Sequence, residues 1–234
     1  MKIDLKEYFA EKERFTGQAG TGPVITLSRE YGCSIDLIAR KLVSRLNDQS
    51  HIKTPWKYLN KEILMESAQN LHLNPLEVEH AMSPHEKNFI EDIFTSFSTE
   101  RHVNENKIHE NVRDVILAYA NRGNIVVVGQ GGVAITRHIR KSLHVKVIAP
   151  MDWRVEQIRA SRKVSAKEAE SLAREQDKRR DLCIRNLLKH SFDHSIFDLV
   201  LNRSTLSEPE IVDQIVVLAH SKGLIDRSLH TLLH

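Results

Sequence analysis

The chain has 234 residues, of which 41% are hydrophobic and 28% charged, a composition typical of a soluble globular protein. This length allows one α/β domain with a large core, or one such domain with an inserted segment. The 34 basic and 31 acidic residues leave a net charge of +3, which argues against a nucleic-acid-binding polyelectrolyte.

Two cysteines, Cys33 and Cys183, are too few for a disulfide framework or a thiolate zinc site. His190 and His194 lack a third ligand nearby in the sequence, so we predict no metal site built by the protein alone. The charged N-terminal stretch argues against a signal peptide, and no run of about 20 apolar residues could span a bilayer. We therefore expect a cytoplasmic protein that does not bind membranes.

Residues 1–22 are expected to form a short amphipathic helix and a flexible linker. The linker contains Gly17, Gly20 and Gly22 and superficially resembles a glycine-rich nucleotide-binding loop. Such a loop must follow a strand, whereas this one precedes the first predicted strand, so we interpret it as an entry segment.

A strand–turn–helix unit follows, in which residues 24–27 predict a buried strand and apolar residues from Ile35 to Leu46 recur at helical spacing. The turn between them, residues 28–34, is small and polar. Such a turn aims free backbone N–H groups and the positive end of the helix dipole at one point, which suits a phosphate. Only Gly32 of the full phosphate-loop pattern is present, so an ordinary strand-to-helix connection is the alternative.

Residues 61–105 show helical spacing interrupted by Pro75 and Pro84, and they predict a helical insertion between the first two predicted strands. Four consecutive β-branched residues, Ile125–Val128, then predict a central strand buried on both faces. The glycine-rich turn 129–132 follows this strand directly. Two further strands are predicted at 143–149 and 197–201.

Ser165 and Glu168 form a capping-box pattern that opens a long predicted helix reaching about Lys189. The middle of this helix is rich in basic residues: Arg174, Lys178, Arg179, Arg180 and Arg185. Phosphate binding is one interpretation of these arginines. A solvated face, on which they pair with acidic residues at helical spacing, is the other.

Strands that alternate with helices and are apolar throughout predict a parallel sheet covered on both faces. In such sheets ligands bind beyond the carboxyl ends of the strands. The turns 28–34 and 129–132 both lie at these ends, so we expect the ligand site there.

Five segments occur in the order found in the cytidylate-kinase-like proteins, a branch of the P-loop nucleoside monophosphate kinases: ITLSREYGCSIDLIARKL, YLNKEIL, IVVVGQGG, EQDKRRDLCIR and FDLVLNRSTLSEPEIVDQI. The chain resembles this family from about residue 24 to 217. The resemblance implies a P-loop nucleotide-kinase fold, with a parallel five-stranded sheet flanked by helices. It further implies a helical monophosphate-binding insertion at about 61–105 and a helical lid at about 163–190, within a single domain of residues 23–220 and before a C-terminal tail, 221–234.

The resemblance also implies roles for individual residues. Those expected to contact the donor phosphates are Ser28, Arg29, Gly32, Cys33 and Ser34. Those expected near the acceptor are Asn60, Lys61, Gly129, Gln130 and Gly131. The catalytic lid residues are expected to be Asp177, Arg180 and Arg185. ATP and Mg²⁺ are the implied cofactors, CMP or dCMP is the implied partner, and no oligomeric state is predicted.

The chain departs from the family pattern at the first turn, where residues 33–36 read Cys-Ser-Ile-Asp instead of Ser-Gly-Gly-Arg. Asn60 stands where Asp is usual, and Gln130 where Arg is usual. Losing one well-placed donor costs on the order of 10²–10³ in rate. Two functions therefore stay open: an ATP-dependent kinase of CMP or dCMP, and a weak or inactive kinase relic that binds a nucleotide or phosphorylated ligand as a regulatory module. Nucleic-acid binding through residues 178–185 is disfavoured, because no aromatic residues interleave with those charges.

Overall fold

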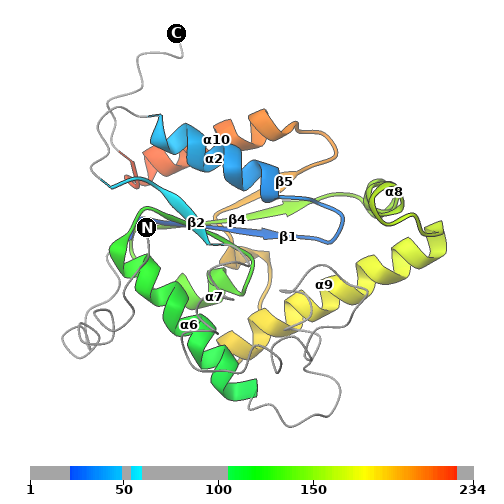
Figure 1. Cartoon of the computed structure of the whole chain (residues 1–234), viewed down its shortest axis with the longest axis horizontal. Helices are drawn as coiled ribbons and strands as arrows, with labels where there is room; N and C mark the ends of the chain where they lie inside the picture. Colours follow the sequence, from blue (N-terminus) through cyan, green and yellow to red (C-terminus); the bar gives the residue numbers. More distant parts are fainter. Residues whose placement is uncertain (1–21, 49–53, 60–104, 226–234) are drawn as a thin grey trace.

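The computed structural model describes residues 22–48, 54–59 and 105–225 (Figure 1). The predicted N-terminal helix, the predicted insertion up to residue 104 and most of the predicted tail lie outside the described residues. So do two of the predicted acceptor residues, Asn60 and Lys61.

Five parallel strands form one sheet in the order β2-β3-β1-β4-β5. The strands are β1 (Val24–Arg29), β2 (Lys57–Leu59), β3 (Ile125–Val128), β4 (Ser142–Ile148) and β5 (Leu199–Asn202). This architecture confirms the predicted parallel five-stranded α/β sheet. All four residues of β3 are buried, as a central strand requires.

The short edge strand β2 differs from the sequence interpretation, which predicts no strand between residues 24–27 and Ile125–Val128. Tyr58 pairs with Val126 and Leu59 with Val127, so β2 exists through its pairing with β3. A three-residue segment has too little periodicity of its own to predict a strand. The segment between β2 and β3 therefore follows the second strand of the chain, not the first.

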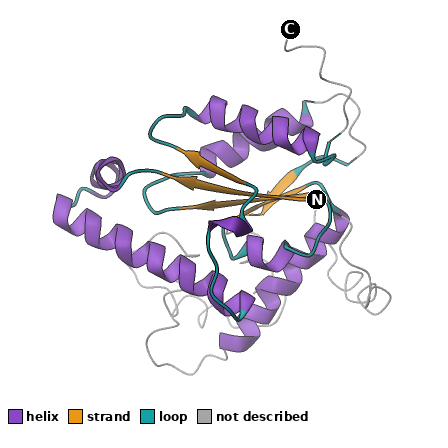
Figure 2. Ribbon diagram, turned by 180° about the vertical axis from the view of Figure 1, so that it is seen from behind, coloured by secondary structure: helices purple, strands orange, loops and turns teal. Residues whose placement is uncertain are grey.

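Helices cover both faces of the sheet (Figures 1 and 2). One face carries α2 (Asp36–Asn47) and α10 (Glu208–Ser221), and the other carries α6 (Glu105–Arg122), α7 (Gly132–Thr136) and the long α9 (Ala166–Leu188). Helix α8 (Met151–Arg162) leads from β4 into α9. Among the described helices, none is long and apolar enough to cross a membrane.

The two faces of β4 differ in chemistry. The face toward α2 and α10 is apolar and carries the largest core cluster, to which β4 contributes Leu143, Val145 and Val147. The alternate residues of the same strand are Ser142, His144 and Lys146, which belong to the opposite face, toward α7 and α9. One strand thus builds the core on one side and a polar row on the other.

The helix termini follow their local sequence. The Ser165 side chain accepts a hydrogen bond from the Glu168 N–H at the start of α9, and Ser207 and Glu210 form a complete capping box at the start of α10. These contacts confirm the predicted start of the long helix, whose last residue is Leu188.

His144 is buried in the polar row of β4. Its ring nitrogens lie 2.9 Å from the Thr26 hydroxyl and 3.2 Å from the Ser142 hydroxyl. Burial lowers the pKa of His144 from 6.5 to about 4. The nearby Asp198 carboxylate raises this pKa by a smaller amount, and Lys222 lowers it slightly. The ring is therefore neutral at pH 7.

This lowered pKa makes the stability of the domain depend on pH. As the pH falls, the unfolded chain binds a proton at His144 near pH 6.5, whereas the folded chain does so only near pH 4. The stabilisation is complete above pH 6.5 and is lost as the pH falls toward 4. We expect the free energy of unfolding to fall by about 2 kcal/mol more in the native protein than in His144→Gln between pH 7.5 and 4.5. Urea titrations at each pH measure this difference, and parallel curves for the two proteins would contradict it.

Candidate functional site

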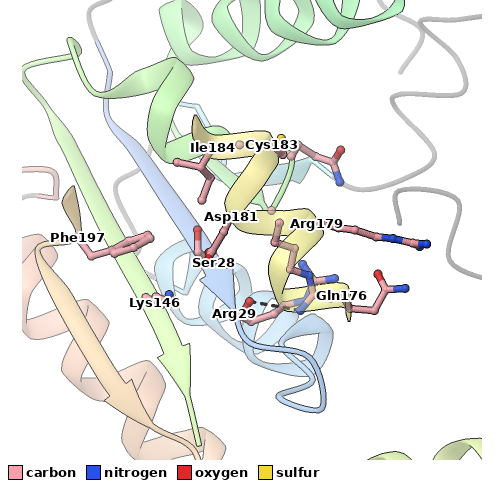
Figure 3. Close-up of a pocket in the computed structure, with 13 residues that line it drawn as sticks. Ser28, Arg29, Lys146, Gln176, Arg179, Asp181, Cys183, Ile184 and Phe197 are labelled. Atoms are coloured by element: carbon pink, nitrogen blue, oxygen red, sulfur yellow. Dashed lines mark hydrogen bonds between the residues drawn. The ribbon is translucent and has the colours of Figure 1, made fainter. Parts of the chain in front are cut away.

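A pocket lies at the carboxyl edge of the sheet, between β1, the turn after β3 and helix α9 (Figure 3). Its volume is about 60 Å³. A cavity of roughly 10–15 Å³ can hold one water molecule, so this pocket has room for a phosphate-sized group. The residues that line it outside α9 are Ser28, Arg29, Gly129, Gln130, Gly131, Lys146 and Phe197. Helix α9 contributes Gln176, Arg179, Arg180, Asp181, Cys183 and Ile184.

Strand register places two polar side chains together in this pocket. Ser28 pairs with Lys146 across β1 and β4, so both side chains leave the sheet on the α9 side. Ser28 lies at the end of β1, where its strand opens into the following turn. The pocket floor is therefore part of the sheet itself and does not depend on a loop.

The turn after β3 consists of three consecutive residues with positive φ: Gly129 at 70°, Gln130 at 59° and Gly131 at 64°. A side chain on Gly129 would lie 2.9 Å from the Arg29 guanidinium, and one on Gly131 would overlap Leu187 of α9. Glycine at these positions lets Arg29 and α9 approach the backbone closely. Gln130, between them, is 6% exposed.

Positive charge predominates in the pocket. Four cationic side chains and one carboxylate, that of Asp181, line it: Arg29, Lys146, Arg179 and Arg180. Carboxylates just outside the lining pair with two of them, Glu175 with Arg179 at 2.6 Å and Asp177 with Arg180 at 3.9 Å. Arg180 donates a hydrogen bond to the Arg29 carbonyl oxygen at 3.3 Å, and its guanidinium lies over the Tyr31 ring. The lining therefore favours an anionic ligand.

The turn after β1 has a different character. Cys33 and Ile35 are each 1% exposed and pack into the core beside α2. Burial raises the pKa of the Cys33 thiol to about 12, with a smaller contribution from Glu30, so this thiol is not a reactive thiolate. Asp36 is the first residue of α2 and is exposed, so a negative charge lies at the helix N-terminus.

Asp177 and Arg154 tie this turn to α9. The Asp177 carboxylate accepts a hydrogen bond from the Tyr31 N–H at 2.7 Å and another from the Arg154 guanidinium at 2.5 Å. Arg154, 5% exposed, also donates to the carbonyl oxygens of Tyr31 and Ala149, each at 3.1 Å. Gly32, with φ at 93°, allows the turn to lie directly against Arg154 of α8.

The structure brings six of the predicted site residues together in the pocket: Ser28, Arg29, Gly129, Gln130, Gly131 and Arg180. Five others do not line it. Gly32, Cys33 and Ser34 lie in the turn beyond it, Asp177 faces that turn, and Arg185 is exposed farther along α9.

The sequence analysis did not assign six of the pocket residues to the site: Lys146, Gln176, Asp181, Cys183, Ile184 and Phe197. It also missed Arg154. The sequence pattern could have indicated Lys146, because polar and apolar residues alternate along β4 and Lys146 is one of the polar residues. No sequence signal distinguishes Arg154, because Arg159 and Arg162 lie on the same helix and only Arg154 is buried.

The residues of the pocket fit the implied cofactors in part. Its cations and the Gln130 amide nitrogen, which is buried without a hydrogen-bond partner, suit phosphate oxygens. The Ser28 hydroxyl and the Asp181 carboxylate are the oxygen groups that could meet a Mg²⁺ ion shared with phosphate. Within the described residues, no group of three or more His, Cys, Asp or Glu side chains could hold a metal alone.

The model of the cytidylate kinase-like family matches residues 24–205, most of the chain. The chain belongs to the cytidylate kinase-like family. The described residues form one parallel sheet, and the pocket lies at the edge where ligands of such sheets bind.

Solved structures and curated proteins add more distant likenesses. An uncharacterized protein from Eubacterium ventriosum has a TM-score of 0.61 at 18% identity, covering 85% of this chain and 98% of that one, and it supports the fold alone. Dephospho-CoA kinase from Campylobacter jejuni gives a TM-score of 0.41 at 14% identity, covering 86% and 97%. A uronate isomerase from Corynebacterium glutamicum is 25% identical over 158 residues, which are 67% of this chain but only 28% of the relative.

The contact between Arg154 and Asp177 predicts strong energetic coupling. We expect a double-mutant cycle of Arg154→Met and Asp177→Asn to give a coupling free energy of about 2 kcal/mol, because the guanidinium is buried and shared among several acceptors. Urea unfolding of the four proteins measures it.

The matched control is Arg174 with Glu170 on the same helix, an ion pair whose side chains are 66% and 46% exposed. The corresponding Arg174→Met and Glu170→Gln cycle should give less than about 0.5 kcal/mol. Equal coupling in the two cycles would show that Arg154 has no special structural role.

Proposed function

We propose that this cytidylate kinase-like protein is an ATP-dependent nucleoside monophosphate kinase that transfers the γ-phosphoryl group of ATP to CMP or dCMP. One observation carries the proposal. At the carboxyl edge of the sheet, a phosphate-sized pocket gathers four cationic side chains and a buried amide that has no partner. Phosphoryl transfer needs this kind of site, because it depends on aligned reactants and neutralised phosphate oxygens more than on covalent chemistry by the protein.

Each part of the pocket has a role in this proposal. Arg29 and Arg180 neutralise the phosphoryl oxygens between donor and acceptor, with Arg180 oriented by its bond to the Arg29 carbonyl. The glycines of the turn 129–131 let Arg29 and α9 lie close to the backbone, which keeps Arg29 at the pocket. Mg²⁺, when bound, would supply further charge neutralisation beside Ser28 and Asp181. Asn60 and Lys61 remain proposed acceptor contacts, and Arg185 a proposed lid residue.

The turn after β1 favours a second function. In this function the protein is a weak or inactive kinase relic that binds a nucleotide or phosphorylated ligand as a regulatory module. Ile35 is buried in the core, and Asp36 places a carboxylate at the start of α2. The carboxylate repels a phosphate at that helix end, and reshaping the turn would require removing Ile35 from the core. Both functions use the same pocket, and they differ in whether the donor phosphate is held well enough for transfer.

A coupled ADP-release assay with ATP, Mg²⁺ and CMP, dCMP, UMP or AMP separates the two functions. We expect turnover selective for CMP or dCMP, reduced about 10²–10³-fold by Arg180→Ala, because a preorganised cation is lost. The control is Arg174→Ala, whose side chain is exposed on the same helix outside the pocket, and it should retain full activity.

Thermal melting of the same samples completes the test. A ligand-dependent rise in melting temperature without turnover would overturn the kinase and support the regulatory module. Neither turnover nor a rise in melting temperature with any of the four nucleotides would exclude both functions.

A further inference from the structure

Three backbone N–H groups of the turn after β1 are used by contacts within the protein. The Tyr31 N–H donates to Asp177, the Cys33 N–H to the Glu30 carbonyl, and the Glu30 N–H to the carbonyl of Val147 on β4. The adjacent Asp36 adds negative charge. A phosphate bound by these three N–H groups would have to displace their contacts, and the pocket on the α9 face of the sheet offers an anion a second position.

Lys146 offers a cation on the sheet itself. Its side chain is half-buried in the pocket, opposite Ser28 in the register of β1 and β4. The ammonium nitrogen lies 5.4 Å from the centre of the Phe197 ring, which covers one side of it. Within the part of the chain that the structure describes, no carboxylate forms an ion pair with it. A partly desolvated ammonium without a carboxylate partner favours an anionic ligand.

Gln130 gives a second, independent indication. The residue is 6% exposed, and its Nε2 has no hydrogen-bond partner. Leaving a buried donor unpaired is unfavourable, and positive φ angles at 129–131 hold the residue at the pocket. An oxygen acceptor of a ligand in the pocket would satisfy this donor.

We propose that Lys146 and Gln130 bind the phosphate of the nucleoside monophosphate acceptor on the α9 face of the sheet. Lys146 provides a positive charge on the sheet itself for this phosphate. This inference rests on the proposed function, because it assigns the pocket to a phosphate monoester. The volume of about 60 Å³ suits a single phosphate group, with the nucleoside extending beyond it.

Isothermal titration tests this assignment, with CMP, inorganic phosphate and cytidine as the three probes. Lys146→Met keeps the apolar stem against Phe197 and removes the charge. We expect it to weaken binding of CMP and of inorganic phosphate roughly 10- to 100-fold, the effect of losing a charge-assisted hydrogen bond. Cytidine, which has no phosphate, should bind both proteins equally. Lys146→Arg should restore CMP affinity to within about threefold, because it restores the charge.

The matched control is Lys178→Met, because Lys178 is exposed on α9 outside the pocket. This variant should bind all three probes as the native protein does. Gln130→Met gives a second variant, for which we expect a loss of CMP affinity of about 5- to 20-fold from one neutral hydrogen bond. Circular dichroism melting of each variant verifies that it is folded.

The outcomes distinguish this inference from the kinase. Unchanged phosphate and CMP affinity in folded Lys146→Met would overturn the role of Lys146, while turnover that depends on Arg180 would leave the kinase intact. Equal weakening of CMP and cytidine would reveal a structural role and would also overturn it. Absence of CMP and phosphate binding in the native protein would overturn the inference together with the proposed function.

Discussion

The buried guanidinium of Arg154 is the contact on which the arrangement of the site depends. It joins the end of β4, the turn after β1 and helix α9, through the Ala149 and Tyr31 carbonyls and the Asp177 carboxylate. Burying a cation is favourable only when its donors are satisfied, and these acceptors come from three separate segments. The position of α9 is thereby coupled to the sheet, and with it the positions of Arg179 and Arg180 in the pocket.

This arrangement separates two tasks that a phosphate-binding turn usually combines. The turn after β1 packs against α8, α9 and the core, so its side chains mainly stabilise the fold. The sheet face below α9 carries the polar and cationic groups, because the residues of β4 alternate between the two faces. His144 is held neutral by burial in the same polar row, and Lys146 lies two residues farther, at the pocket.

Much of the fold could be predicted, because its signals are local. Four β-branched residues marked β3, and Ser165 marked the start of α9. The pocket could be predicted only in part. The order of motifs led to Arg29, Gly129 and Arg180. Strand β2, however, arises from pairing with β3, and Arg154 differs from the other arginines of α8 only through tertiary burial. Neither the strand pairing nor the tertiary burial can be predicted from the residue types alone.

A crystal structure of the protein with CMP shows where the phosphate binds. We expect the phosphate on the α9 face of the sheet, within hydrogen-bond distance, about 2.7–3.2 Å, of Lys146 Nζ and of the Gln130 amide. A phosphate bound instead to the backbone of residues 32–35, with Lys146 and Gln130 unoccupied, would contradict it.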